Sequence, residues 1–302
     1  MNELYYRHSG KWSLGAALPA LAVGALAAVV LAAVYAYAAL YVPVVGTITV
    51  ILTAGFGAAA GAIPGTMLKR GNTRSKAVAA IIGVVVGLIA LWASWVFWIY
   101  ALLRRSDVDV SLPAIAFAPT SLWSAMVEVN KRGVWNVHGL QPSGAFLWVI
   151  WGLEACIIFF LSYALCEGTI AAQPFCESCN RWCEAEEDVG SCAAPANAGA
   201  GKAENAAELR TRLEAKDFSA LEKQGPVGNR AEWLRWDLHV CKSCGGTNTL
   251  ALKAVKAEVE KKGQVKLHSV ELFHGLIVSQ AEVEQLRGVG QKLRLSPATA
   301  AA

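Results

Sequence analysis

Two pairs of cysteines, each with two residues between them, stand out in the C-terminal half of the chain. Cys176 and Cys179 belong to the stretch "CESC", and Cys241 and Cys244 belong to "CKSCGG". A thiolate pair at this spacing can bind one ion from a single tight turn, and two such turns supply four sulfur ligands in a tetrahedral shell. A shell closed in this way has no open position for water, so it indicates a structural rather than a catalytic metal.

Zinc is the metal that we expect at these cysteines. The same four ligands suit iron, as a rubredoxin-like centre or a [4Fe–4S] cluster, and in an oxidising compartment the cysteines would form disulfides instead. The membrane orientation predicted below places them in a reducing compartment, which favours Zn²⁺ over disulfides. Three further residues could replace one of the four ligands: Cys183, Cys192 and His239.

The residues after Cys244 indicate a β-hairpin. The run "TNTLALKAVKAEVE" leads to a turn at Lys261–Gly263, and "QVKLHSVELFHGLIVS" returns. Two CxxC pairs, an insert of 61 residues between them and a following hairpin resemble a zinc ribbon. The resemblance covers only the C-terminal part of the chain. It implies one structural zinc ion, and a protein partner by analogy with other modules of this fold.

Composition divides the chain of 302 residues into two unlike halves. Its 55% apolar content and mean hydropathy of +0.40 exceed those of an ordinary soluble protein. Up to Cys166 there are five acidic residues against ten Lys and Arg, whereas from Glu167 onward there are eighteen against seventeen. The net charge of +4 therefore comes from the apolar half, and we expect no nucleic acid to bind the near-neutral second half.

The expected fold is an all-α bundle of four transmembrane helices followed by a small α+β, zinc-ribbon-like soluble domain. Each of four apolar runs has the roughly 20 residues that a bilayer crossing needs. They span about 14–41, 44–68, 77–103 and 145–166, within a transmembrane domain at 14–166. The other predicted parts are an N-terminal tail at 1–13, an external loop at 104–144 with an amphipathic helix, a metal-binding domain at 167–295 with a flexible linker at about 193–203, and a disordered tail at 296–302.

Basic residues near the ends of the spans predict that both termini are cytoplasmic. The short loop "KRGNTRSK", Lys69–Lys76, has four basic and no acidic residues, and Arg7 and Lys11 precede the first span. Positive charge of this kind collects on the cytoplasmic side. Four basic residues in the opposite loop reduce the asymmetry: Arg104, Arg105, Lys131 and Arg132. Because the Ala-, Gly- and Val-rich composition is typical of a GC-rich bacterial genome, we expect a bacterial inner membrane.

Glycines recur at four-residue spacing within two of the spans. They are Gly57, Gly61 and Gly65 in the second span, with Gly83 and Gly87 in the third. Small residues on one helix face let neighbouring backbones approach closely, which is how helices associate in lipid. We expect these faces to pack the bundle, with a homo-oligomer or a channel as the alternative.

Glu154 is an acidic residue close to the middle of the fourth span. An ionised carboxylate at that depth is costly and usually faces the interior of a bundle. Two interpretations remain open: a neutral carboxylic acid that links helices by hydrogen bonds, and a site for a proton or a cation.

No hydrolase elbow, P-loop, dinucleotide-binding loop or HExxH motif occurs in the sequence. We therefore predict a non-enzymatic membrane protein whose cytoplasmic zinc module recruits a protein partner, supports an assembly or regulates one. One alternative is a transporter or channel component that uses Glu154, and a second is an iron–sulfur or rubredoxin-like redox component.

Overall fold

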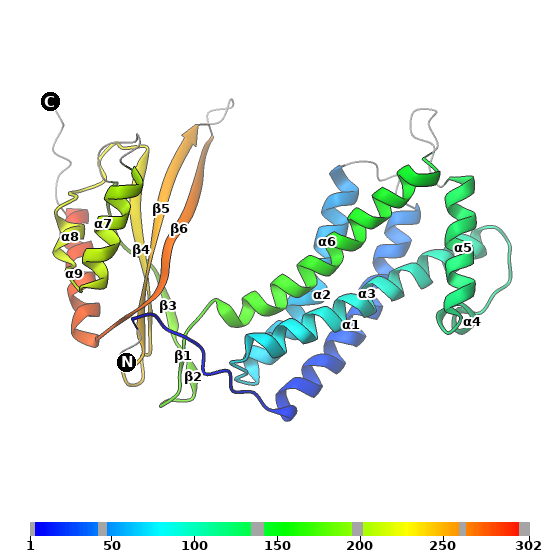
Figure 1. Cartoon of the computed structure of the whole chain (residues 1–302), viewed down its shortest axis with the longest axis horizontal. Coiled ribbons are helices and arrows are strands. Elements are labelled where there is room, and N and C mark those ends of the chain that lie inside the picture. The colour runs from blue at the N-terminus through cyan, green and yellow to red at the C-terminus, as the bar shows by residue number, and fades with distance from the viewer. Residues whose placement is uncertain (1–3, 42–46, 134–141, 195–201, 260–263, 296–302) are drawn as a thin grey trace. The chain divides into compact units, whose positions relative to one another are not determined.

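The computed structural model of the chain describes residues 4–41, 47–133, 142–194, 202–259 and 264–295 (Figure 1). It divides into two compact units. The helical unit comprises Ser9–Ala172, and the sheet unit comprises residues up to His8 together with those from Gln173 onward.

Four long helices form the helical unit: α1 (Leu14–Tyr41), α2 (Thr47–Arg70), α3 (Lys76–Arg105) and α6 (Gly144–Ala171). All four are long and apolar enough to cross a membrane. The fourth helix runs five residues beyond the predicted end at Cys166. The helix continues there because the chain meets no proline before Pro174, so backbone hydrogen bonding outlasts the apolar run. The predicted start of the second span, residues 44–46, lies outside the described residues.

Two shorter helices, α4 (Leu112–Ala116) and α5 (Pro119–Arg132), lie between α3 and α6. Helix α5 occupies the stretch where the sequence predicts an amphipathic helix, and Gly133 ends it with a φ of 76°. Leu122 is buried, whereas Trp123 is largely exposed and stacks on Trp148 of α6 at 5.2 Å between ring centroids. This part of the loop therefore packs onto the bundle with one apolar face.

The sheet unit is built on a four-stranded antiparallel sheet in the order β3-β4-β5-β6. The strands are β3 (Glu184–Ala193), β4 (Glu232–Val240), β5 (Asn248–Val259) and β6 (Val265–Val278). The β5–β6 pair is the hairpin that the sequence predicts. Strand β3 was not predicted. It pairs with β4, and together the two strands bring part of the stretch between the two CxxC pairs into the sheet.

Helices α7 (Lys202–Glu214), α8 (Ser219–Glu222) and α9 (Gln280–Leu295) lie on one side of this sheet (Figure 1). Between them and the strands lies an apolar core, whose largest fully buried side chains are Trp236, Phe218, Leu213, Leu221, Leu238 and Leu250. Helix α9 begins with a capping box, in which Glu282 accepts from the Ser279 backbone N–H at 2.6 Å and Ser279 accepts from the Glu282 backbone N–H at 3.3 Å. Of the predicted linker and tail, residues 195–201 and 296–302 lie outside the described residues.

The first residues of the chain join the sheet unit rather than forming a separate tail. Tyr5 pairs with Leu276 on the edge of β6, and the Tyr6 backbone N–H donates to the Gly275 carbonyl at 2.7 Å. On the other side of the Tyr5–Leu276 pair, the Ile277 N–H donates to the Leu4 carbonyl at 3.0 Å. A short N-terminal segment thus covers part of an edge strand whose backbone groups would otherwise seek another partner.

Candidate metal centre

The first thiol pair lies on a small hairpin formed by β1 (Phe175–Cys176) and β2 (Arg181–Trp182). Cys176 pairs with Arg181, and the chain reverses over the residues between them. Asn180 adopts a φ of 50° in this reversal, a left-handed conformation that asparagine tolerates better than most residues. The hairpin therefore presents Cys176 and Cys179 from one tight turn.

The second pair lies in the connection between β4 and β5. The Gly245 N–H donates to the Cys241 carbonyl at 2.8 Å, and Gly245 has a φ of +60°, which favours glycine. Asn248 fixes this turn at two points. Its side-chain oxygen accepts from the Cys241 N–H at 3.2 Å, and its amide nitrogen donates to the Gly245 carbonyl at 2.7 Å.

The register of the sheet brings the two pairs together. Glu184, the first residue of β3, pairs with Val240, the last residue of β4, and Val240 pairs in turn with Asn248. The turn that carries one thiol pair therefore adjoins the hairpin that carries the other, although Cys179 and Cys241 are separated by 61 residues. Strand β3, which no sequence pattern predicted, makes this juxtaposition.

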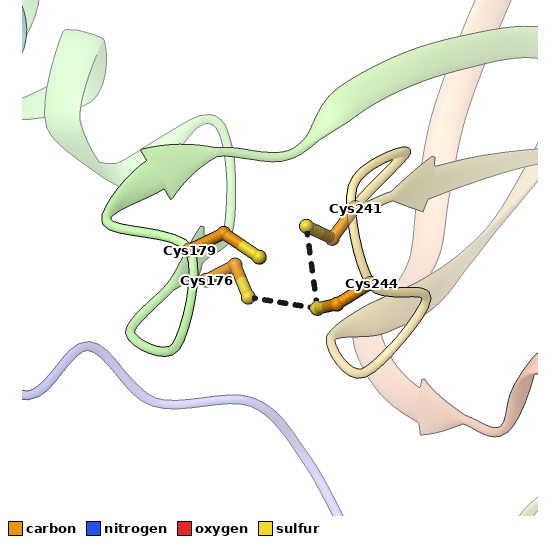
Figure 2. Close-up of side chains that lie close together, drawn as sticks. All are labelled: Cys176, Cys179, Cys241 and Cys244. Atoms are coloured by element: carbon orange, nitrogen blue, oxygen red, sulfur yellow. Dashed lines mark hydrogen bonds between the residues drawn. The ribbon is translucent and has the colours of Figure 1, made fainter.

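The four sulfur atoms converge on one point (Figure 2). Their Sγ atoms all lie within 4.8 Å of one another, with 3.5 Å between Cys176 and Cys244 and 3.7 Å between Cys241 and Cys244. Zn–S bonds of about 2.3 Å in a tetrahedron separate the sulfur atoms by about 3.8 Å. All eight cysteines are free thiols. The four residues thus fit a single tetrahedral metal ion, and the geometry alone does not select the metal.

Hydrogen bonds around the cluster favour ionised sulfur at one position. Burial acts to raise the pKa of Cys176, but hydrogen bonds from the Thr247 hydroxyl, the Cys179 backbone N–H and the neighbouring thiols lower it to about 6. The thiols of Cys244, Cys241 and Cys176, together with burial, raise the pKa of Cys179 to about 12. Since a cysteine binds a metal ion as the deprotonated thiolate, binding of an ion to these four cysteines would release protons. The Gly246 N–H, 3.3 Å from the sulfur of Cys244, is a further donor of the kind that supports a metal-bound thiolate.

The three alternative ligands lie outside this group of four. Cys183 is close by, but its thiol donates to the Thr247 carbonyl at 3.3 Å, and burial raises its pKa to about 12. Cys192 is fully buried in the apolar core, where burial likewise raises its pKa to about 12. His239 lies on β4 with its ring 5.5 Å from that of His274. Cys183 and Cys192 are therefore neutral thiols at neutral pH.

Tyr6 supports the first thiol pair, and sequence reasoning did not find it. Its hydroxyl accepts from the Phe175 backbone N–H at 2.9 Å and lies 3.2 Å from the Phe175 carbonyl, directly before Cys176. No local pattern could link residues 169 positions apart. Asn248 was also missed, although an asparagine just after "CKSCGG" is a signal for a side chain that closes a turn.

The predicted glycines lie where α2 and α3 contact α6. A Cβ atom built on Gly57 or Gly61 would come within 2.8 Å or 2.7 Å of a Cα atom of α6, and one on Gly65 would come within 3.0 Å. Gly83 and Gly87 of α3 meet the same part of α6, around Ser162. The Ser162 hydroxyl donates to the Gly57 carbonyl at 3.1 Å. Within this chain, these glycines let the backbones of α2 and α3 contact that of α6.

Glu154 lines a cavity of about 60 Å³ to which all four long helices contribute. Tyr35, Ser94 and three tryptophans, Trp95, Trp98 and Trp151, also line it. The Ser94 hydroxyl donates to the Leu91 carbonyl at 2.8 Å, and the Tyr35 hydroxyl lies 3.0 Å from that of Thr53. The carboxylate of Glu154 thus faces the inside of the bundle beside aromatic rings.

The chain was compared with known proteins. No protein-family model, no curated protein and no solved structure matches it.

Proposed function

We propose that this chain is a multi-pass integral membrane protein whose sheet unit holds one structural zinc ion and serves as a non-enzymatic interaction or scaffold module. One observation carries the proposal: four cysteine sulfur atoms, from two turns far apart in the sequence, lie within 4.8 Å of one another. Four thiolates around one ion leave no position for substrate or water, so the ion's role is to hold the fold together.

The spacing of the sulfur atoms favours a single ion over an iron–sulfur cluster. Each cysteine of a [4Fe–4S] cluster binds a different iron, so its sulfur atoms stand further apart than those around one ion. A rubredoxin-like iron fits the same spacing as zinc. Zinc is the proposed metal because its closed four-thiolate sites are typical of structural modules such as the zinc ribbon, which the two CxxC turns and the β5–β6 hairpin resemble.

The N-terminal segment supports an even number of membrane crossings. Residues that pair with each other must lie on one side of the bilayer, and Tyr5 pairs with Leu276. Four crossings between them satisfy this requirement. The basic loop Lys69–Lys76 favours the cytoplasm as that side, and thiols stay reduced there. We place the protein in a bacterial inner membrane on the basis of its composition.

The free end of the β5–β6 hairpin is the surface that we propose for a protein partner or a second copy. Val265, Leu267 and Val270 of β6 are 61%, 58% and 65% exposed. Their pairing positions place Val265 and Leu267 on one face of the hairpin and Val270 on the other. Apolar side chains left in water on both faces of a strand pair are typical of a contact surface.

Metal analysis of purified variants tests the proposal. The wild-type chain, purified in detergent from cells grown with zinc and iron, should carry one zinc per chain, and Cys241→Ser should carry far less. Cys183→Ala is the matched control, because its thiol lies beside the cluster but outside the group of four, and it should keep the zinc. Equal zinc loss from both variants would contradict the proposed ligand set.

A further inference from the structure

The cavity beside Glu154 is independent of the proposed zinc site and has a chemistry of its own. Among the described residues that line it, Glu154 carries the only charge. Its carboxylate forms no hydrogen bond or ion pair with another residue in the described part of the chain. Glu154 lies ten residues into α6, about 15 Å along the helix axis, so the charge is half-buried near the middle of the bundle. A carboxylate in that position requires either a proton or a cationic partner.

The lining distinguishes between kinds of cation. An inorganic cation requires several oxygen ligands, whereas the described lining offers one carboxylate and only three hydroxyl groups, those of Tyr35, Thr49 and Ser94. Most of the remaining wall is aromatic or aliphatic. The faces of aromatic rings attract ammonium groups, tryptophan most strongly, and the attraction is greatest where water is excluded.

The three tryptophans form a fixed aromatic wall. The Trp95 ring meets that of Trp151 edge-to-face at 4.8 Å between centroids and that of Trp98 at 5.6 Å, and Trp98 and Trp151 lie 6.3 Å apart. Trp98 and Trp151 are almost completely buried. Side chains held in mutual contact need little reordering to receive a ligand, which favours binding.

We propose that this cavity binds a small alkylammonium ion, with Glu154 as the counter-charge and the tryptophan wall supplying cation–π contacts. The size follows from the volume: a cavity of about 60 Å³ is small, so the ligand has few carbon atoms. Binding places the ammonium group against the carboxylate and its carbon atoms against the rings. No covalent step is involved.

Ligand-observed NMR titration of the full-length protein in lipid nanodiscs tests this proposal, with ethylammonium as the probe and ethanol as its neutral counterpart. We expect saturable ethylammonium binding in the millimolar range, as suits a ligand of three heavy atoms, and no saturable binding of ethanol. Glu154→Gln, which keeps the shape and removes the charge, should weaken binding about tenfold or more. Trp95→Phe should weaken it about two- to fivefold, because phenylalanine is the poorer cation–π partner.

Glu128→Gln is the matched control, because it removes a carboxylate of the same unit that lies on α5 and pairs with Arg132. It should bind ethylammonium as the wild type does. Unchanged binding by Glu154→Gln, equal binding of ethanol, displacement by the same concentration of sodium, or no saturable binding by the wild type would each overturn the proposal. If Glu154→Gln does not fold, the ethylammonium–ethanol comparison in the wild type and the Trp95→Phe variant decide the question.

Discussion

The two units of this chain keep distant segments together by different physical means. In the helical unit, Gly57 and Gly61 bring the backbone of α2 against that of α6, so the contact is direct van der Waals packing. In the sheet unit, an apolar core lies between one sheet face and three helices, and four thiols converge at the end of the strands. Lipid is as apolar as leucine, so helices within it gain little from burying large side chains, whereas a small domain in water gains from both an apolar core and a metal.

The comparison predicts that metal loss affects one unit alone, and this is the largest effect that we expect. A structural zinc ion contributes on the order of 10 kcal/mol to folding, so Cys176→Ser should destabilise the sheet unit by several kcal/mol. Hydrogen exchange measured separately in the two units would detect it: amides of β4 and β5 should exchange much faster, while those of α2 and α6 stay protected. Equal loss of protection in both units would contradict the division.

The converse variant is directed at the helical unit. Gly61→Ala places a methyl group against the backbone at Ser162 and should destabilise the bundle by about 1–3 kcal/mol, measured by unfolding in a titration with denaturing detergent. Gly55→Ala is its control on the same helix, because a Cβ atom at Gly55 has no neighbour within 4 Å. That control should be neutral or slightly stabilising, since alanine favours a helix more than glycine does. If both variants behaved alike, close backbone approach would not be what holds α2 to α6.

Asp237 allows the polar contacts of the sheet unit to be tested by pH. Burial acts to raise the pKa of Asp237, but the ammonium of Lys253 at 2.7 Å and the Asp188 N–H at 2.8 Å outweigh it and lower the pKa. The pKa of an aspartate in the unfolded chain is near 3.9, and in the folded protein the pKa of Asp237 is lower. The charged carboxylate therefore stabilises the fold fully above about pH 3.9, and this stabilisation is lost as the pH falls through the lower, folded pKa. Asp237→Asn should therefore cost about 1–3 kcal/mol at neutral pH and flatten the loss of stability below about pH 4.

Urea unfolding of the sheet unit followed at several pH values would measure this effect. Glu187→Gln is the control, because it removes an exposed carboxylate from strand β3 of the same sheet, and it should leave the loss of stability at acidic pH unchanged. If the free energy of unfolding fell equally steeply with falling pH in Asp237→Asn and in the wild type, this carboxylate would not set the pH dependence.

The smallest expected effect concerns the N-terminal segment. Tyr6→Phe removes the hydroxyl that contacts both backbone groups of Phe175, and it should destabilise the first thiol pair by about 1 kcal/mol. Faster release of zinc to a chelator, with unchanged protection of the helical unit, is the expected readout. A release rate equal to that of the wild type would mean that the segment covers the sheet edge without supporting the metal turn.

The sequence allowed prediction of those features that depend on local patterns. Four apolar runs, two CxxC pairs and the β5–β6 hairpin are each visible within about thirty residues, because span length and turn spacing are local properties. Strand β3 was missed because "EAEEDVGSCA" lacks regular alternation of apolar and polar residues. The pairing of Tyr5 with Leu276 could not be predicted, because nothing local marks a partner 271 positions away. The cavity beside Glu154 also depends on four helices meeting, which no single span specifies.

The most direct test of the central claim is the metal content of the purified full-length chain, measured together with its absorption spectrum and the reactivity of its thiols. We expect one zinc per chain, no visible absorption band, and four cysteines that resist alkylation until a chelator removes the metal. Iron with visible absorption bands, or a disulfide among Cys176, Cys179, Cys241 and Cys244 in place of any metal, would contradict it.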